Sequence, residues 1–284
     1  MTVVKIILVG LLIAFNIFLF KGNKKFISEE KEVVQNNGTV EKNSLTDSSS
    51  INDPDSLTKA ANNANQLADS TTLNTKKSFV APLSAMDSAA IKQGLVDIQK
   101  IIPNILIDLK YASEENFMGT DVYGDFRRCY LQPEVAEKLK YAQQLLVQEN
   151  DTLTLMVFDG LRPLSVQYKM WERVKHTKLA KYVANPKTGS MHNIGVAVDI
   201  TLANNKGIAL EMGTEYDYFG ELAQPRHEEK LLERGRLNKQ QIENRKLLRK
   251  VMLEAGFTGI KSEWWHFNGF PKDVARKKYG EVNL

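Results

Sequence analysis

Residues 190–199 read Ser-Met-His-Asn-Ile-Gly-Val-Ala-Val-Asp, and the rest of the chain is organised around this stretch. Between Gly195 and Leu202 every second residue is a large aliphatic one, which predicts a β-strand with one strongly apolar face. Asp199 falls on the opposite face of that strand. Gly195 permits a bend before the strand, so His192 and Asp199 can reach one metal ion although they lie seven residues apart.

A second stretch far downstream, Glu263-Trp264-Trp265-His266, supplies another imidazole and a spare carboxylate. His192, Asp199 and His266 would then be three protein ligands, with the fourth position left open for water. Glu263 would stand beside that position as a general base. This is the inventory of a catalytic zinc site.

Each motif also has a plainer interpretation. A histidine and an aspartate at this spacing occur often by chance, and Trp264 and Trp265 are equally suited to a hydrophobic core with His266 packed beside them. The small number of histidines favours the metal site, because two of the chain's four fall in the two motifs. The others, His176 and His227, lie among charged residues and are expected at the surface.

The remaining periodicity predicts an α+β fold with a central, mostly antiparallel sheet flanked by helices. Pro133 suits the first position of a helix with a clear apolar stripe. Asn238 and Gln241 resemble a capping box at the start of another helix, which stops at Gly256. Strands are expected at 105–111, 152–158, 195–202 and 257–267, and a third helix at 165–175.

Composition excludes some classes of function. The net charge is only +4 and no basic stripe is interleaved with aromatic residues, so nucleic-acid binding is not expected. Cys129 is the only cysteine, which excludes an intrachain disulfide and any multi-cysteine zinc cage. We expect Cys129 to be a small buried residue.

The first part of the chain differs from the rest. Residues 1–21 predict a signal or signal-anchor segment, because an uncharged run from Ile6 to Phe20 is flanked by lysines. No small-x-small cleavage site follows it, which favours an uncleaved anchor holding the protein in the cell envelope over secretion. Residues 22–84 are polar and predict a disordered linker. The globular catalytic domain is expected at 85–284.

Five dispersed motifs between Ile101 and Phe267 resemble those of a known family. SxHxxGxAxD followed by ExxWH is similar to the zinc D,D-peptidase group, which includes the D-alanyl-D-alanine dipeptidases of the VanX type. Further matches favour the dipeptidase branch. They are Tyr111-Ala112 with Asn116-Phe117-x-Gly119, Asp159-Gly160-x-Arg162-Pro163, Met212-Gly213-Thr214-x-Tyr216-Asp217 and Glu263-Trp264-Trp265-His266.

The resemblance implies zinc-dependent hydrolysis of D-Ala-D-Ala to free D-alanine, in cell-wall precursor metabolism or recycling. It implies one Zn²⁺ per chain, held by His192, Asp199 and His266, with Glu263 moving the proton. The N-terminal segment would be the only contact with a membrane. Two alternatives stay open: a D,D- or L,D-carboxypeptidase that trims peptidoglycan stem peptides, and a tethered zinc module that binds wall peptides without turnover.

The resemblance also implies roles for residues outside the metal shell. Arg162 would stabilise the negative charge that grows on the peptide carbonyl oxygen, although a surface ion pair with Asp159 is its plainer interpretation. Asp217 would bind the substrate ammonium, and Tyr111 and Ser190 would donate or accept hydrogen bonds around the dipeptide. The plainer interpretation makes Asp217 a turn residue, Tyr111 an aromatic residue at a strand end and Ser190 a loop hydroxyl.

Overall fold

The strand predicted after Gly195 is β5 (Ala197–Asn204), and it occupies the middle of a five-stranded sheet in the order β2-β4-β5-β7-β6. It pairs antiparallel with β4 (Leu153–Asp159) and with β7 (His266–Asn268). At the edges, β2 (Leu106–Ile107) runs parallel to β4 and β6 (Thr258–Gly259) runs antiparallel to β7. Only one of the pairings is parallel, so the fold is α+β with a mixed, mostly antiparallel sheet.

The structure is a computed structural model that describes residues 82–282 and 284. The predicted signal or anchor segment, 1–21, and all but the last three residues of the predicted linker, 22–84, lie outside the described residues. Within the described part of the chain, no helix combines the length and the apolar character that a membrane crossing requires.

Helices surround the sheet, and a small antiparallel ribbon pairs β1 (Val96–Asp97) with β3 (Tyr130–Leu131). The α-helices of the described residues are α2 (Ala85–Lys92), α3 (Ile98–Ile101), α4 (Pro133–Glu149), α5 (Leu164–Val174), α6 (Glu228–Glu233), α7 (Lys239–Glu254) and α8 (Lys272–Lys278). The short 3-10 helices are η2 (Lys110–Ala112), η3 (Lys178–Lys181), η4 (His192–Ile194), η5 (Glu221–Ala223) and η6 (Pro225–His227).

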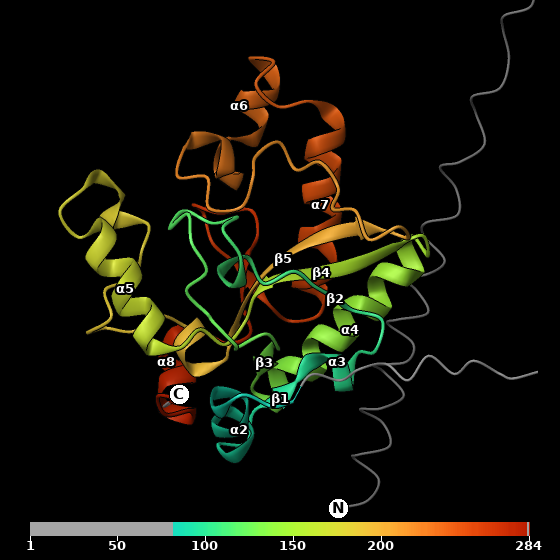
Figure 1. Ribbon diagram of the computed structural model, residues 1–284. Coiled ribbons are helices and arrows are strands. Elements are labelled where there is room, and N and C mark those ends of the chain that lie inside the picture. Colours follow the sequence, from blue (N-terminus) through green and yellow to red (C-terminus); the bar gives the residue numbers. More distant parts are fainter. Residues whose placement is uncertain (1–81, 283) are drawn as a thin grey trace, which may run out of the picture. The chain divides into compact units, whose positions relative to one another are not determined.

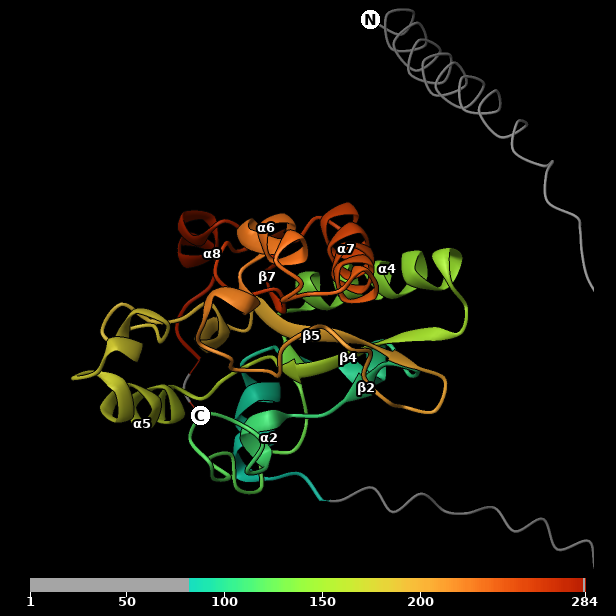
Figure 2. The same ribbon diagram turned by 90° about the horizontal axis from the view of Figure 1, so that it is seen from above.

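Helices α4 and α7 lie side by side against one face of the sheet (Figures 1 and 2). Both begin as local sequence dictates. Pro133 occupies the first turn of α4. Asn238 and Gln241 form the capping box of α7, each side chain accepting the other residue's backbone N–H. The apolar residues of α4 and of the second half of α7 are buried in the main core of the molecule.

Two predicted strands are shorter in the structure. The strand expected at 105–111 is limited to β2, and Tyr111 instead lies in η2, where its ring is buried. The strand expected at 257–267 is a hairpin of β6 and β7, and the loop between them carries Glu263. Trp264 and Trp265 are both buried although they are adjacent, which breaks the alternation that a continuous strand needs.

Gly195 makes the bend before β5 in a left-handed conformation, with φ at +68°. A Cβ atom there would come within 2.7 Å of a Leu95 methyl group. We therefore expect Gly195→Ala to lower the free energy of unfolding by about 2–4 kcal/mol, from backbone strain and overpacking together. Urea denaturation measures the loss.

Gly235→Ala is the matched control, because Gly235 has φ at +64° but no atom within 4 Å of an added Cβ. It should cost only the backbone strain, about 1–2 kcal/mol. Equal losses in the two variants would show that the Leu95 contact does not constrain the bend.

Candidate functional site

Three neighbouring strands place one polar side chain each in a row across the sheet. In the register of the sheet, Asp159 of β4 lies opposite Asp199 of β5, and Asp199 lies opposite His266 of β7. Directly opposed residues of antiparallel strands point to the same face with their Cβ atoms close together. An irregularity in β4 between Val157 and Asp159 shifts the register by one residue, and with this shift the pairing brings two carboxylates and an imidazole to one point.

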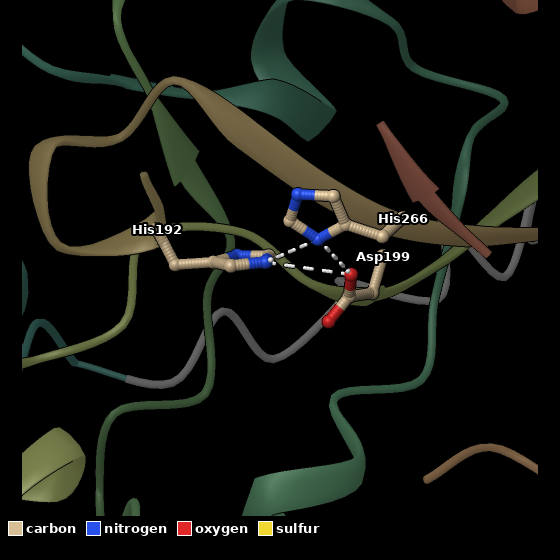
Figure 3. A group of neighbouring side chains, drawn as sticks. All are labelled: His192, Asp199 and His266. Atoms are coloured by element: carbon tan, nitrogen blue, oxygen red, sulfur yellow. Dashed lines mark hydrogen bonds and ion pairs between the residues drawn. The ribbon is translucent and has the colours of Figure 1, made fainter. Parts of the chain in front are cut away.

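His192 joins this row from η4, the short turn that Gly195 ends. Its Nε2 lies 3.2 Å from Nδ1 of His266 and 3.4 Å from Oδ1 of Asp199. The remaining distance, from His266 Nδ1 to Asp199 Oδ1, is 2.9 Å (Figure 3). Among the described residues, these three side chains form the group of histidine and carboxylate ligands that can hold one metal ion.

The outer ring nitrogen of each histidine is already bonded to an oxygen acceptor. His192 Nδ1 donates to the Gly160 carbonyl oxygen at 2.8 Å, and His266 Nε2 donates to Asn268 Oδ1 at 3.1 Å. In the neutral imidazole this leaves the inner nitrogens with their lone pairs facing each other. Metal-binding histidines are held in this way, with the second nitrogen donating to an oxygen of the protein.

The carboxylate of Asp199 completes the donor set as an anion. Burial alone would raise its pKa, but positive charge and N–H donation from His192 and His266, when their inner nitrogens carry a proton in the absence of a metal, hold the pKa of Asp199 well below its ordinary value. Its second oxygen, Oδ2, accepts the Tyr216 hydroxyl at 2.8 Å. Two imidazole nitrogens and one carboxylate oxygen with converging lone pairs fit a divalent cation that prefers mixed nitrogen and oxygen ligands.

Asp159 connects this group to Arg162. One oxygen of Asp159 accepts the hydroxyl of Tyr123 at 2.5 Å. The other accepts Nε and Nη2 of Arg162 at 2.8 and 2.6 Å. A third guanidinium bond runs from Nη1 of Arg162 to Gln167 at 3.1 Å. The ion pair foreseen as the plainer interpretation of Arg162 is present, but it is buried and it lies at the site.

Arg162 also lines the cavity that contains the three candidate ligands. Its Nη2 lies 3.6 Å from Oδ2 of Asp199, and its guanidinium lies over the Tyr111 ring. Burial opposes its charge, but Asp159 holds the pKa of Arg162 well above its ordinary value. Only three of the five N–H groups of a guanidinium are used in these hydrogen bonds, so two donors remain for a ligand.

Glu263 lines the same cavity from the loop between β6 and β7. Its side chain is half-buried, and among the described residues no hydrogen bond or ion pair holds its carboxylate. Burial raises the pKa of Glu263 to about 7, helped by the negative charges of Asp199 and Asp217 and opposed by His266. A carboxylate with a pKa near neutrality and no fixed partner is suited to accept and release a proton.

Asp217 and Tyr111 meet in another part of this cavity. The Tyr111 hydroxyl donates to Asp217 at 3.0 Å, and the Phe117 N–H donates to it at 3.3 Å. Asp217 holds a left-handed backbone with φ at +59°, a conformation that aspartate tolerates better than most residues. Burial raises the pKa of Asp217 to about 7. A nearby cation would restore the charge of this carboxylate.

Ser190 lies on the cavity wall as well, next to the turn that carries His192. Its hydroxyl accepts the His192 N–H at 3.3 Å, and its own N–H donates to the Asn193 side chain at 2.7 Å. The structure therefore brings all eight residues singled out from the sequence to one cavity of about 220 Å³. The roles assigned to them individually stay predictions.

Sequence reasoning missed three groups that hold the site together. The hydroxyls of Tyr216 and Tyr123 bind Asp199 and Asp159. Trp264 Nε1 donates to the Thr214 hydroxyl at 2.8 Å and so joins the loop of Glu263 to the loop of Asp217. Tyr216 and Thr214 lie within the motif that ends at Asp217, and Trp264 lies within the motif that ends at His266; these positions are the signals that the sequence offers for them.

The two histidines outside the motifs lie away from the cavity, and Cys129 is buried as predicted. His176 is exposed and His227 is partly exposed beside Glu221. Cys129 is buried with a free thiol, and its sulfur packs against Gly160, where an added Cβ would come within 2.4 Å of it. Cys129 thus supports the turn whose carbonyl oxygen orients His192.

Comparison with known proteins extends what the geometry indicates. Residues 91–283 match a family model of the peptidase family M15, described as D-ala-D-ala dipeptidase. The match covers most of the chain and includes every residue of the site.

The chain belongs to the D-Ala-D-Ala dipeptidase family.

Curated members of this family have moderate identity to the chain. The D-alanyl-D-alanine dipeptidase of Escherichia coli (strain K12) is 34% identical over 173 residues, which is 61% of this chain and 83% of that protein. The enzyme of the same name from Enterococcus faecium is 27% identical over 194 residues, covering 61% of this chain and 90% of the relative. That of Enterococcus faecalis is 27% identical over 197 residues, covering 62% and 92%.

Membership of the D-Ala-D-Ala dipeptidase family makes the chain a metallopeptidase, as its motifs predict. The region that the relatives share begins after the predicted linker. The first ninety residues of the chain are therefore not part of what defines the family.

The two buried carboxyl groups give the metal-free protein a specific pH dependence. The pKa values of Glu263 and Asp217 rise from 4.5 and 3.8 to about 7 on folding. A group that keeps its proton to higher pH in the folded state stabilises the fold at low pH, and this contribution is lost as pH rises. The free energy of unfolding should therefore decrease between about pH 4.5 and about pH 7.

Urea denaturation of the chelated protein across this range measures the decrease. Glu263→Gln, which cannot titrate, should show a smaller decrease than the unsubstituted protein. Identical slopes in the two proteins would mean that Glu263 has an ordinary pKa in the folded state.

Proposed function

We propose that this protein hydrolyses the free dipeptide D-Ala-D-Ala to two molecules of D-alanine, with one zinc ion per chain. The observation that carries the proposal is a single small cavity in which three converging ligands, an unpaired carboxylate and a buried guanidinium meet. Membership of the D-Ala-D-Ala dipeptidase family and the names of the curated relatives support the choice of substrate.

His192, Asp199 and His266 are the residues that would hold the zinc ion. Three protein ligands with one position left open are typical of catalytic rather than structural zinc. When bound, zinc would make a water molecule acidic enough to lose a proton near neutral pH and would polarise the peptide carbonyl. The bonds to Gly160 and Asn268 keep both imidazoles in the orientation that this requires.

Glu263 moves the proton in the proposed reaction. Its carboxylate takes a proton from the attacking water and gives it to the nitrogen of the leaving amine when the peptide bond breaks. A pKa of about 7 suits both halves of this task, because the group is neither firmly protonated nor firmly ionised at neutral pH.

Arg162 stabilises the negative charge that develops on the peptide carbonyl oxygen in the proposed reaction. Asp159 and Gln167 fix its guanidinium before the substrate arrives, so no reorganisation is needed in the transition state. The guanidinium also stays positively charged at every working pH, because Asp159 raises its pKa.

Asp217 distinguishes a free dipeptide from the end of a longer chain. A free dipeptide carries an ammonium group, whereas an acylated or extended substrate has none at that position. The buried Asp217 carboxylate gains a counter-ion only from the free dipeptide. This favours the dipeptidase over the carboxypeptidase alternative, as does a cavity below the range of roughly 300–1,000 Å³ that drug-sized ligands occupy.

The cellular setting is proposed from the sequence alone. An uncleaved segment at residues 1–21 and the polar linker at 22–84 would hold the catalytic domain at the cell envelope. There D-Ala-D-Ala would be consumed in cell-wall precursor metabolism or recycling.

The first test separates metal binding from catalysis. Glu263→Ala should retain zinc and lose turnover of D-Ala-D-Ala by about 10²–10⁴-fold, because it removes the general base and no ligand. His192→Ala should lose both zinc and turnover. Metal analysis after dialysis and assay of released D-alanine measure the two properties.

Chelator treatment of the unsubstituted protein is the control, and added zinc should restore its activity. Normal hydrolysis by Glu263→Ala would refute the assignment of the base. Zinc binding without any release of D-alanine from the unsubstituted protein would instead support the non-catalytic module.

The second test concerns substrate selection. The unsubstituted protein should cleave D-Ala-D-Ala and leave N-acetyl-D-Ala-D-Ala intact. Asp217→Asn should lower kcat/KM for the free dipeptide by about 10–100-fold, because it removes a charge-assisted bond to the ammonium group.

Asp151→Asn is the comparison for Asp217→Asn, because it removes the charge of an exposed aspartate in the turn before β4. Its kinetics should match those of the unsubstituted protein. Efficient cleavage of the acetylated dipeptide would favour the carboxypeptidase alternative.

A further inference from the structure

The two oxygens of the Asp199 carboxylate lie in different surroundings. Oδ1 faces the two imidazoles, at 2.9 Å from His266 and 3.4 Å from His192. Oδ2 points away from them, accepts the Tyr216 hydroxyl at 2.8 Å and lies 3.6 Å from Nη2 of Arg162. One oxygen is thus left for a metal ion while the other is occupied by protein groups.

Of the two groups at Oδ2, only Tyr216 is at hydrogen-bonding distance. The 3.6 Å separation from Arg162 is that of an ion pair without a direct hydrogen bond. Arg162 is also committed to Asp159, which it binds through two nitrogens. The direction of the Asp199 carboxylate therefore depends chiefly on the Tyr216 hydroxyl.

The Tyr216 ring is held rigidly enough for this task. It packs against Phe158, Trp265 and Tyr111, with ring centroids 5.4, 5.4 and 5.8 Å away. Phe158 belongs to β4 and Trp265 directly precedes β7, so the two strands that flank Asp199 also support the ring. Because the Tyr216 ring is packed on several sides, its hydroxyl is held in one position.

We propose that Tyr216 is a positioning residue for Asp199, whose hydroxyl holds the carboxylate so that Oδ1 alone is presented to the metal ion. This inference rests on the proposed function only in requiring that zinc binds at His192, Asp199 and His266. Without the hydroxyl, the carboxylate is free to turn toward Arg162 or to offer both oxygens to the metal. In either case the geometry and strength of metal binding change.

Zinc affinity tests the proposal without reference to catalysis. Competition with a chromogenic chelator should show that Tyr216→Phe binds zinc about 10–100-fold more weakly than the unsubstituted protein, the usual effect of losing a hydrogen bond to a metal ligand. Tyr216→Leu, a second variant without the hydroxyl, should lose affinity as well. Tyr168→Phe removes a hydroxyl from an exposed tyrosine on α5 and should bind zinc normally.

Thermal unfolding of the metal-free proteins separates positioning from a purely structural role. The proposal expects chelated Tyr216→Phe to stay cooperatively folded, with only the drop of a few degrees in unfolding temperature that one lost buried hydrogen bond causes, and to gain less stability when zinc is added. Unchanged zinc affinity in Tyr216→Phe would overturn the proposed role of Tyr216, and so would the loss of the metal-free fold in both variants.

If the unsubstituted protein binds no zinc, the metal in the proposed function is wrong and this inference falls with it. Normal zinc affinity in the variants alone refutes only the role of Tyr216.

Discussion

The pairing register of β4, β5 and β7 is the constraint on which the site depends. It sets Asp159, Asp199 and His266 side by side on the face of the sheet that α4 and α7 leave uncovered. Side chains alternate between the faces of a strand, so a slip of one residue in β5 would turn Asp199 into the helix-covered core and bring Val198 or Ile200 to the site. The aliphatic face of β5 makes such a slip costly. Burial of the aliphatic side chains of β5 therefore also determines that Asp159, Asp199 and His266 meet on the other face of the sheet.

The charges inside this arrangement depend on hydrogen bonds to neighbouring groups of the protein. Asp159 orients the Arg162 guanidinium and stabilises its positive charge. The carbonyl oxygen of the adjacent Gly160 orients the His192 imidazole. Asp199 is held as an anion by the two histidines beside it, whereas burial outweighs the neighbouring charges at Glu263 and Asp217 and raises their pKa values to about 7. One small cavity therefore holds carboxyl groups with opposite shifts of pKa, and the difference lies in what each of them contacts.

Local features of the structure were accessible from the sequence and long-range ones were not. The alternation in β5, the proline that opens α4 and the capping box of α7 act over a few residues, and each was predicted. The grouping of His192, Asp199 and His266 was reached only by combining distant motifs. The sequence predicts Tyr111 in a strand, whereas it lies in η2 with its ring buried. The Tyr216 bond to Asp199 depends on how the chain returns after β5, which no local pattern encodes.

The hydrogen bond between Trp264 and Thr214 ties together two loops that approach the cavity from different parts of the chain. One loop bears Glu263 and the other bears Asp217, so the side chains proposed to move the proton and to bind the ammonium group lie on loops that are joined to each other. This bond fixes the spacing between the two loops, and with it the distance between the two unshielded carboxyl groups of the cavity.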